Sequence, residues 1–380
     1  MAISQITNKS ITDATITAAD MATGAVEGAM TTQLSGRRNI AYNGAMTVWQ
    51  RGTSADTATT NDYMCDRWQI GHSGLDGNVD WDQETASTPD GFGYALKVST
   101  DASETSLDAG DYLFFRQKFE GQDLQQLQKG TSGSKSLTVS FWVKSSVAST
   151  YTVELEDADN TRTISKSYAI SSADTWEFKT VTFEGDTTGA LDNDNGDSLR
   201  LYFWIDAGSN FTSGTFSTAW QTTSNSERVY DTTGWLESTT PTFYITGVQL
   251  EVGSVATPFE HRSYGEELLA CQRYLNIMRQ NGSNSNIRYC SGICANATAG
   301  EMAYVVYPEL RSTPALGVAA AANYRVRSDA ARTCTSVGSD NRHKNGVNIQ
   351  TTVSGGQTSG FGANFDATSA SSFIELDAEL

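Results

Sequence analysis

Histidine, one of the side chains that most often carry chemistry, is scarce in this 380-residue chain, and its copies lie far apart along the sequence. Its histidines are His72, His261 and His343, each in a polar or loop context. The sequence therefore offers few histidines for a Ser-His-Asp triad or a histidine-based metal cluster. We interpret each histidine as a surface residue. The sequence also lacks a Gly-rich phosphate loop followed by Lys-Ser/Thr and a dinucleotide fingerprint after a strand.

The cysteines are odd in number and show no spacing typical of a disulfide framework. They are Cys65, Cys271, Cys290, Cys294 and Cys334. Cys290 and Cys294 form a C-x3-C pair, but the surrounding region has no second ligand pair that would complete a zinc site. We therefore predict mostly buried free thiols, which fits assembly in a reducing cytosol.

Carboxylates are abundant, with 44 acidic residues against 26 basic ones and a formal net charge of −18. This surface would repel phosphate backbones and anionic bilayers, so we expect no nucleic-acid partner. No stretch of 18 apolar residues and no signal peptide is present, so membrane insertion and secretion by a leader are not expected. A glycosidase would need two carboxylates at a suitable separation, and the sequence alone neither nominates nor excludes such a pair.

Aromatic residues supply the more informative candidates. Four of them occupy strand positions whose sequence neighbours already supply the core: Trp142, Tyr202, Trp204 and Tyr244. An aromatic shelf on a sheet can stack against the apolar face of a sugar ring, so these four are the candidate ligand-binding residues. The alternative is that they pack beneath a neighbouring subunit or a long loop.

The segments that position these rings show the alternation of β-strands. The stretch KSLTVSFWVKSS places Leu137, Val139, Phe141 and Val143 on one face, and DSLRLYFWID does the same with Leu199, Leu201, Phe203 and Ile205. Turn signals such as Asn195-Gly196 separate the strands. Several such strands without intervening helical patterns predict an all-β fold, with an antiparallel jelly-roll sandwich over residues 37–262.

Beyond the sandwich, the pattern changes. Ser263 followed by Glu266 would form a capping box at the start of one short helix. Residues 263–380 then return to strand-and-turn texture, which predicts a smaller C-terminal β domain behind that helix. Jelly rolls often fix their termini with calcium, and Glu251 beside the closing strand is a weak candidate for such a metal site. One carboxylate specifies nothing, so metal binding stays open, and no other cofactor is expected.

Residues 1–36 carry apolar side chains at every fifth position, a spacing that suits neither a helix nor a strand. The repeat consists of Ile6, Ile11, Ile16, Met21 and Val26. The segment contains no aromatic residue and cannot bury enough surface to fold alone. Because an isolated tail has no reason to space apolar groups evenly, we predict that the segment packs against other chains.

Several stretches resemble tail-fibre and related virion appendage proteins of tailed bacteriophages, particularly those of marine and cyanobacterial hosts. They are RRNIAYNGAMTVWQRGTS, DYMCDRWQI, SFWVKSS, ADTWEFKTVTFEG and, above all, ITGVQLEVGSVATPFEHRSYGEELLACQRYL. YPELRSTPAL looks like a carboxyl-terminal signature in which an apolar strand runs into an Arg-x-x-Pro turn. The resemblance covers most of residues 1–320 and is specific at residues 245–275.

The resemblance implies a homotrimer whose amino-terminal segment docks on other virion tail or capsid proteins. Residues 1–36 would then be an intertwined stalk or anchor, with one apolar side chain from each chain in every layer. The expected function is a structural, non-enzymatic one: a receptor-binding fibre subunit, assembled in the host cytoplasm and located on the virion, that recognises a host-surface glycan. The alternatives are a purely architectural virion component, such as a capsid-decorating fibre or tail connector, and a polysaccharide depolymerase.

Overall fold

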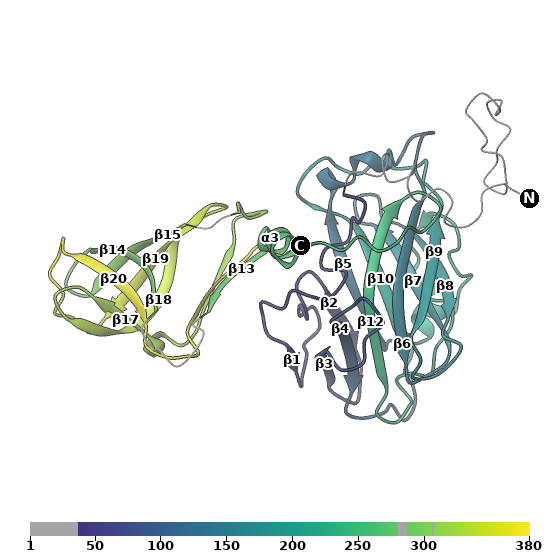
Figure 1. Cartoon of the computed structure of the whole chain (residues 1–380), viewed down its shortest axis with the longest axis horizontal. Coiled ribbons are helices and arrows are strands. Elements are labelled where there is room, and N and C mark those ends of the chain that lie inside the picture. Colours follow the sequence, from purple (N-terminus) through teal and green to yellow (C-terminus); the bar gives the residue numbers. More distant parts are fainter. Residues whose placement is uncertain (1–36, 280–286, 306–307) are drawn as a thin grey trace, which may run out of the picture.

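The computed structural model describes residues 37–279, 287–305 and 308–380 (Figure 1). The apolar residues at every fifth position, Ile6, Ile11, Ile16, Met21 and Val26, lie outside the described residues, so the predicted anchor stays a prediction. The regular secondary structure of the described chain is nearly all β-strand, and the paired strands of its sheets are antiparallel, which confirms the predicted fold class. None of the helices in these residues is both long and apolar enough to cross a bilayer.

Two six-stranded sheets form the sandwich. Sheet A runs in the order β1 (Ser54–Ala55), β3 (Val79–Glu84), β4 (Ala95–Thr100), β12 (Thr242–Val252), β6 (Leu137–Ser145) and β9 (Glu177–Phe183). Sheet B runs in the order β11 (Gln221–Thr222), β8 (Arg162–Ala169), β7 (Thr150–Asp157), β10 (Asp197–Ala207), β5 (Tyr112–Glu120) and β2 (Gln69–Ser73). Short helical turns occur at α2 (Ser209–Thr212) and at residues 121–123, 125–127, 225–227 and 321–323.

The core between the sheets is built by the alternation that the sequence predicts. The inward residues of β6 and β10 are almost completely buried: Leu137, Val139, Phe141, Val143, Leu199, Leu201, Phe203 and Ile205. The rings of Phe141 and Phe203 meet edge to face with centroids 5.0 Å apart across the sandwich. Since neighbouring strand residues point to opposite faces, burying this set turns Trp142, Tyr202 and Trp204 outward.

The helix α3 (Tyr264–Gln272) begins where the sequence predicts. The backbone N–H of Glu266 donates to the Ser263 hydroxyl at 3.3 Å, and the Glu266 carboxylate accepts the Ser263 N–H at 2.9 Å, which completes the capping box. The free cysteines also follow the prediction, because Cys65, Cys271, Cys294 and Cys334 are buried and only Cys290 is half-buried.

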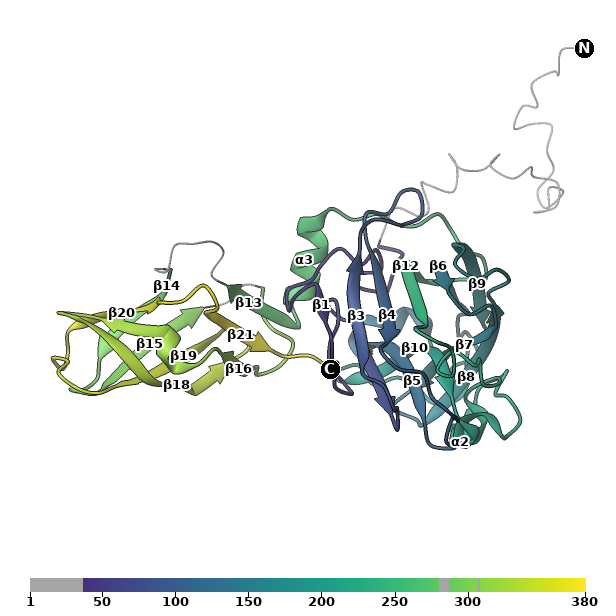
Figure 2. The same ribbon diagram turned by 90° about the horizontal axis from the view of Figure 1, so that it is seen from below.

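The carboxyl-terminal part consists of a three-stranded sheet and a closed barrel. The sheet has the order β13 (Leu275–Arg279), β21 (Phe373–Asp377) and β16 (Ala315–Val318). The barrel has the order β14 (Arg288–Cys294), β15 (Ala299–Val305), β19 (Gly346–Val353), β18 (Ala331–His343), β17 (Tyr324–Arg327) and β20 (Gly362–Ala367). Figure 2 shows the barrel as a separate lobe that projects away from the sandwich, with α3 and β13 leading toward it.

The chain returns from the barrel to the sandwich at its end. Strand β21 brings Asp377 within 2.8 Å of the Arg51 guanidinium, and Glu379 pairs with the buried Arg67. The main-chain oxygen of Leu380 accepts hydrogen bonds from Lys118 Nζ at 2.6 Å and from Tyr63 Oη at 2.9 Å. The barrel is therefore held to the sandwich by an outgoing and a returning segment of the chain.

Candidate functional site

The structure does not bring the four candidate aromatic residues together. Trp142 and Tyr244 lie on β6 and β12 of sheet A, whereas Tyr202 and Trp204 lie on β10 of sheet B. The outward faces of the two sheets point in opposite directions, because the inward faces share one core. The expectation of a single shelf made by all four rings is therefore wrong, and each face has to be considered separately.

On sheet B, Tyr202 and Trp204 are each only 2% exposed. They form a small apolar cluster with Phe114 and with Val229 from the segment that crosses this face. Arg228 of the same segment covers both rings, with its guanidinium carbon 5.0 Å and 5.2 Å from their centroids. Tyr202 and Trp204 therefore pack beneath a long loop, which is the alternative interpretation of these residues. Neither ring is available to stack on a ligand.

The polar groups beneath Arg228 are satisfied inside the protein. The guanidinium donates to Glu154 at 2.8 Å, and the Trp204 indole N–H donates to the same carboxylate at 2.6 Å. Glu156 accepts the Tyr202 hydroxyl at 2.6 Å. Burial raises the pKa of Glu156, but Arg228, Tyr202 and Arg200 outweigh burial and hold this pKa below its usual value. This is the opposite of the raised pKa that a catalytic general acid needs.

On sheet A, by contrast, aromatic side chains line an open cavity of about 280 Å³. Trp142 of β6 and Phe178 of β9 form its floor, with ring centroids 5.4 Å apart, and Phe178 is 50% exposed. Phe92 and Phe259 come from two loops and meet edge to face at 5.1 Å. We call the cavity formed by Trp142, Phe178, Phe92, Phe259 and His261 the aromatic pocket.

Tyr244 lies beside the aromatic pocket on the same sheet face. Lys144, its partner across β6 and β12, places its ammonium 4.1 Å from the Tyr244 ring centroid and 5.3 Å from that of Trp176. Tyr244 and Trp176 meet edge to face at 6.2 Å. Of the four candidates, Trp142 and Tyr244 are therefore the two that remain partly accessible, in an apolar strip with a cation at one side.

A bulge in β12 lets the loop aromatics close over the strand. The register of β12 against β6 shifts between Thr246 and Gln249, and Gly247 in between has a φ of +63°. A Cβ atom at Gly247 would lie 2.7 Å from Phe92 Cζ. Glycine is thus required both by the backbone conformation and by the close approach of the Phe92 ring.

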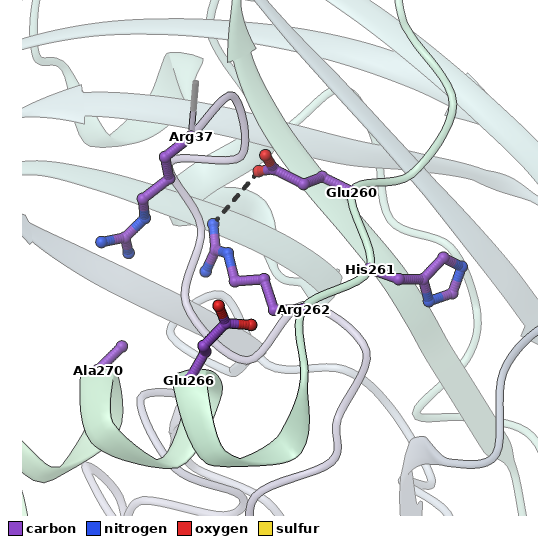
Figure 3. Close-up of a pocket in the computed structure, with 6 residues that line it drawn as sticks. All are labelled: Arg37, Glu260, His261, Arg262, Glu266 and Ala270. Atoms are coloured by element: carbon purple, nitrogen blue, oxygen red, sulfur yellow. Dashed lines mark ion pairs between the residues drawn. The ribbon is translucent and has the colours of Figure 1, made fainter. Parts of the chain in front are cut away.

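A second, polar hollow lies where the described chain begins (Figure 3). This cavity of about 360 Å³ is lined by Arg37, Glu260, His261, Arg262, Glu266 and Ala270. Glu260 accepts the backbone N–H groups of Arg38 and Asn39 at 3.1 and 2.8 Å and pairs with Arg262 at 3.7 Å. The imidazole of His261 points away from that ion pair in Figure 3 and contacts Phe92 and Phe259 instead. The charged groups of this hollow therefore join segments of the fold.

Glu251, the weak metal candidate, is buried and accepts hydrogen bonds from its neighbours. Its Oε1 accepts the N–H of Thr257 at 2.8 Å and an amide hydrogen of Gln249 at 2.9 Å, and its Oε2 accepts the Thr257 hydroxyl at 2.7 Å. The carboxylate thus fixes the loop that carries Phe259. Within the described ranges, no group of three or more His, Cys, Asp or Glu side chains is placed to hold a metal ion.

The sequence analysis does not identify two kinds of residue of the aromatic pocket, a strand residue and three loop residues. Phe178 could have been identified from alternation, because burial of Val181 and Phe183 in ADTWEFKTVTFEG turns Phe178 to the other face. Phe92, Phe259 and His261 lie on loops without periodicity, so no sequence signal places them beside Trp142.

Comparisons with known proteins give structural neighbours only. No family model and no curated protein matches the sequence. One solved structure is the enzymatically active domain of bacteriophage CBA120 tailspike protein 4, at 12% identity and a TM-score of 0.30. The match covers 56% of this chain, which spans only 21% of that chain's length.

The other neighbours include carbohydrate-binding modules. A family 4 module matches 55% of this chain and 97% of its own at 13% identity and a TM-score of 0.30. TmCBM61, solved in complex with β-1,4-galactotriose, matches 57% and 99% at 10% identity and a TM-score of 0.29. At these scores the neighbours do not establish what this chain binds.

Proposed function

We propose that this chain is a non-enzymatic subunit of a bacteriophage tail fibre or related virion appendage and that it binds a glycan of the host surface. The observation that carries this proposal is the aromatic pocket, with the half-exposed Phe178 ring beside Trp142. Flat apolar rings suit the apolar face of a pyranose, and a few polar groups nearby can orient its hydroxyls. The resemblance of residues 245–275 to phage appendage proteins supports the virion part of the proposal.

Such a subunit would act as a homotrimer, with residues 1–36 as stalk and anchor. Three copies of one weak sugar site would give firm attachment through avidity. The full chain should sediment as a trimer, and the double variant Ile11→Asp/Ile16→Asp should dissociate it because charge is introduced into the proposed apolar centre. A variant that remains equally trimeric would contradict this role of residues 1–36.

The direct test of function is competition for adsorption. Purified full-length protein, with its oligomeric mass verified, is added in excess to susceptible cells before phage. Binding to the receptor should block adsorption, whereas undiminished adsorption in the presence of folded protein would overturn receptor recognition. A glycan array probed with the same protein then identifies the saccharide.

An architectural virion component is the second candidate, favoured by apolar side chains that lie outside the aromatic pocket. Val255, in the segment between β12 and α3, and Tyr264 and Leu269 of α3 are 73%, 60% and 44% exposed. Exposed apolar groups of this kind mark protein contacts when they gather in one patch. Location of the protein on the particle by immunogold labelling distinguishes a connector from an outward-facing fibre tip.

A further inference from the structure

Three arginines converge on one carboxylate on the outer surface of the barrel. Asp366 of β20 lies between β14 and β17, and its Cα partners in register are Arg288 on one side and Arg325 on the other. The Nε atoms of Arg288, Arg325 and Arg327 lie 3.4, 3.5 and 3.0 Å from its carboxylate oxygens. The carboxylate is 3% exposed, whereas the side chains of Arg288 and Arg327 are 56% and 44% exposed.

The charge of this cluster is far from balanced. The three guanidinium groups share the single negative charge of Asp366, so the four side chains together carry a formal charge of +2 in a chain whose net charge is −18. The next acidic group along the chain, Asp329, is bound by Arg332 at 2.7 Å and does not change this balance. In the described part of the chain, the Nη groups of Arg288 and Arg327 donate no hydrogen bond, which leaves their planar forks open to an incoming acceptor.

Neutral groups continue the same face toward the other end of β14 and β20. Ser291 donates to the Asn364 side chain at 2.8 Å, one step along from the Arg288–Asp366 pair. Ile293 and Phe361 follow and are 50% and 51% exposed. The face therefore changes from cationic to polar to apolar along a single pair of strands. We call Arg288, Arg325, Arg327, Asp366, Ser291, Asn364, Ile293 and Phe361 the barrel strip.

We propose that the barrel strip is a second saccharide site, selective for acidic sugars whose carboxylate or ester-linked sulfate or phosphate binds Arg288 and Arg327. Guanidinium groups bind such planar or tetrahedral anions through paired, charge-assisted hydrogen bonds. Ser291 and Asn364 offer hydrogen bonds to ring hydroxyls, and the exposed apolar end can contact the next residue of the sugar chain. The inference rests on the proposed function because it takes the ligand to be a host-surface glycan.

The test uses the full chain and isothermal titration with three probes at low ionic strength: tetragalacturonate, its methyl ester and a sulfated galactan tetrasaccharide. The wild type should bind at least one of the two anionic probes, and the methyl ester should bind at least about tenfold more weakly because it lacks the charge. Arg288→Gln/Arg327→Gln should reduce anion binding by about tenfold or more. Lys344→Gln, which removes an exposed cation from the β18–β19 hairpin of the same barrel, should leave binding unchanged.

Equal losses of affinity for the anionic probes in Lys344→Gln and in the arginine variant would overturn the proposal, because they would show that any positive charge on the barrel attracts the probes. Binding of neither anionic probe, or equal binding of the methyl ester, would overturn it as well. Near-ultraviolet circular dichroism verifies the fold of each variant. Trp142→Ala separates the two proposals: it should leave anion binding at the barrel strip intact while it abolishes binding at the aromatic pocket.

Discussion

The guanidinium carbon of Arg67 lies 3.4 Å from the centroid of the Tyr274 ring. Arg67 belongs to the sandwich, and Tyr274 follows α3 at the start of the path toward the barrel. The same guanidinium pairs with Glu379 on the returning segment, so one fully buried cation holds both segments that join the barrel to the sandwich. Burial opposes this charge, but Glu379 and the surrounding tyrosines outweigh burial and raise the pKa of Arg67 above its usual value.

Removing the partner of this buried cation should destabilise the protein strongly. Glu379→Gln leaves Arg67 charged and without its carboxylate, which should lower the free energy of unfolding by roughly 3 kcal/mol. Urea denaturation at pH 7 measures the change. Glu301→Gln, at an exposed position of β15, is the matched control and should change stability by less than about 0.5 kcal/mol. Equal stability of the two variants would contradict the role of Arg67.

Loss of an exposed ring from the aromatic pocket should weaken glycan binding without unfolding the chain. Phe178→Ala should reduce affinity for the array-identified glycan by about tenfold or more, because it removes a half-exposed ring that forms the pocket floor together with Trp142. Tyr230→Ala is the matched control, since Tyr230 is also 50% exposed but lies outside the pocket. Titration calorimetry measures the glycan affinity of both variants. Equal affinities of Phe178→Ala and Tyr230→Ala would show that the glycan binds outside the aromatic pocket.

A methyl group at the β12 bulge should disturb the pocket through Phe92. Gly247→Ala adds strain at φ +63° and pushes the Phe92 ring away, so both stability and glycan affinity should fall. Gly234→Ala has comparable strain at φ +71° but meets no atom within 4 Å. Gly234→Ala should lose about 1 kcal/mol of stability, Gly247→Ala should lose at least as much, and only Gly247→Ala should bind the glycan more weakly. Unchanged affinity in Gly247→Ala would show that Phe92 does not shape the site.

The ion pair between Arg228 and Glu156 should make stability depend on pH in one direction. The folded protein holds the pKa of Glu156 below its unfolded value of about 4.3. The ion pair therefore contributes its full stabilisation of the fold above about pH 4.3, and this stabilisation is lost as the pH falls through the folded pKa. Arg228→Gln should therefore cost more stability at pH 7 than at pH 3. Urea denaturation of both proteins at the two pH values measures this, and a difference that grows toward low pH would contradict the assignment.

The strand alternation in residues 137–145 and 197–207 and the Ser263 capping box could be predicted from the sequence, because burial on one face and local hydrogen bonds leave a periodic or short-range record. The Asn195-Gly196 turn can be predicted for the same reason. Its tertiary use was not visible: the Asn195 main-chain oxygen accepts a hydrogen bond from Arg311 at 2.7 Å, and the same guanidinium donates to Ala378 and Glu379.

The long sequence of residues 245–275, which carries the phage resemblance, also has a structural meaning that only the fold reveals. It contains the β12 bulge, the Glu251 loop, α3 and Tyr274, and together these connect sandwich, pocket and barrel. Arg273 pairs with the fully buried Glu120 carboxylate at 2.7 Å across 153 residues of sequence. This segment therefore forms the junction between sandwich and barrel as well as part of the aromatic pocket.

By itself, the sequence determined which side chains of each strand turn outward, since that follows from a period of two residues and the need to bury one face. It could not determine which outward rings stay accessible. Trp142 and Trp204 both point outward from a strand of the sandwich. The segment that carries Arg228 crosses sheet B and covers Trp204, whereas the loops that carry Phe92 and Phe259 only border Trp142. Accessibility was decided by tertiary structure, because the covering residues are distant in sequence and their placement depends on loop paths that leave no periodic pattern.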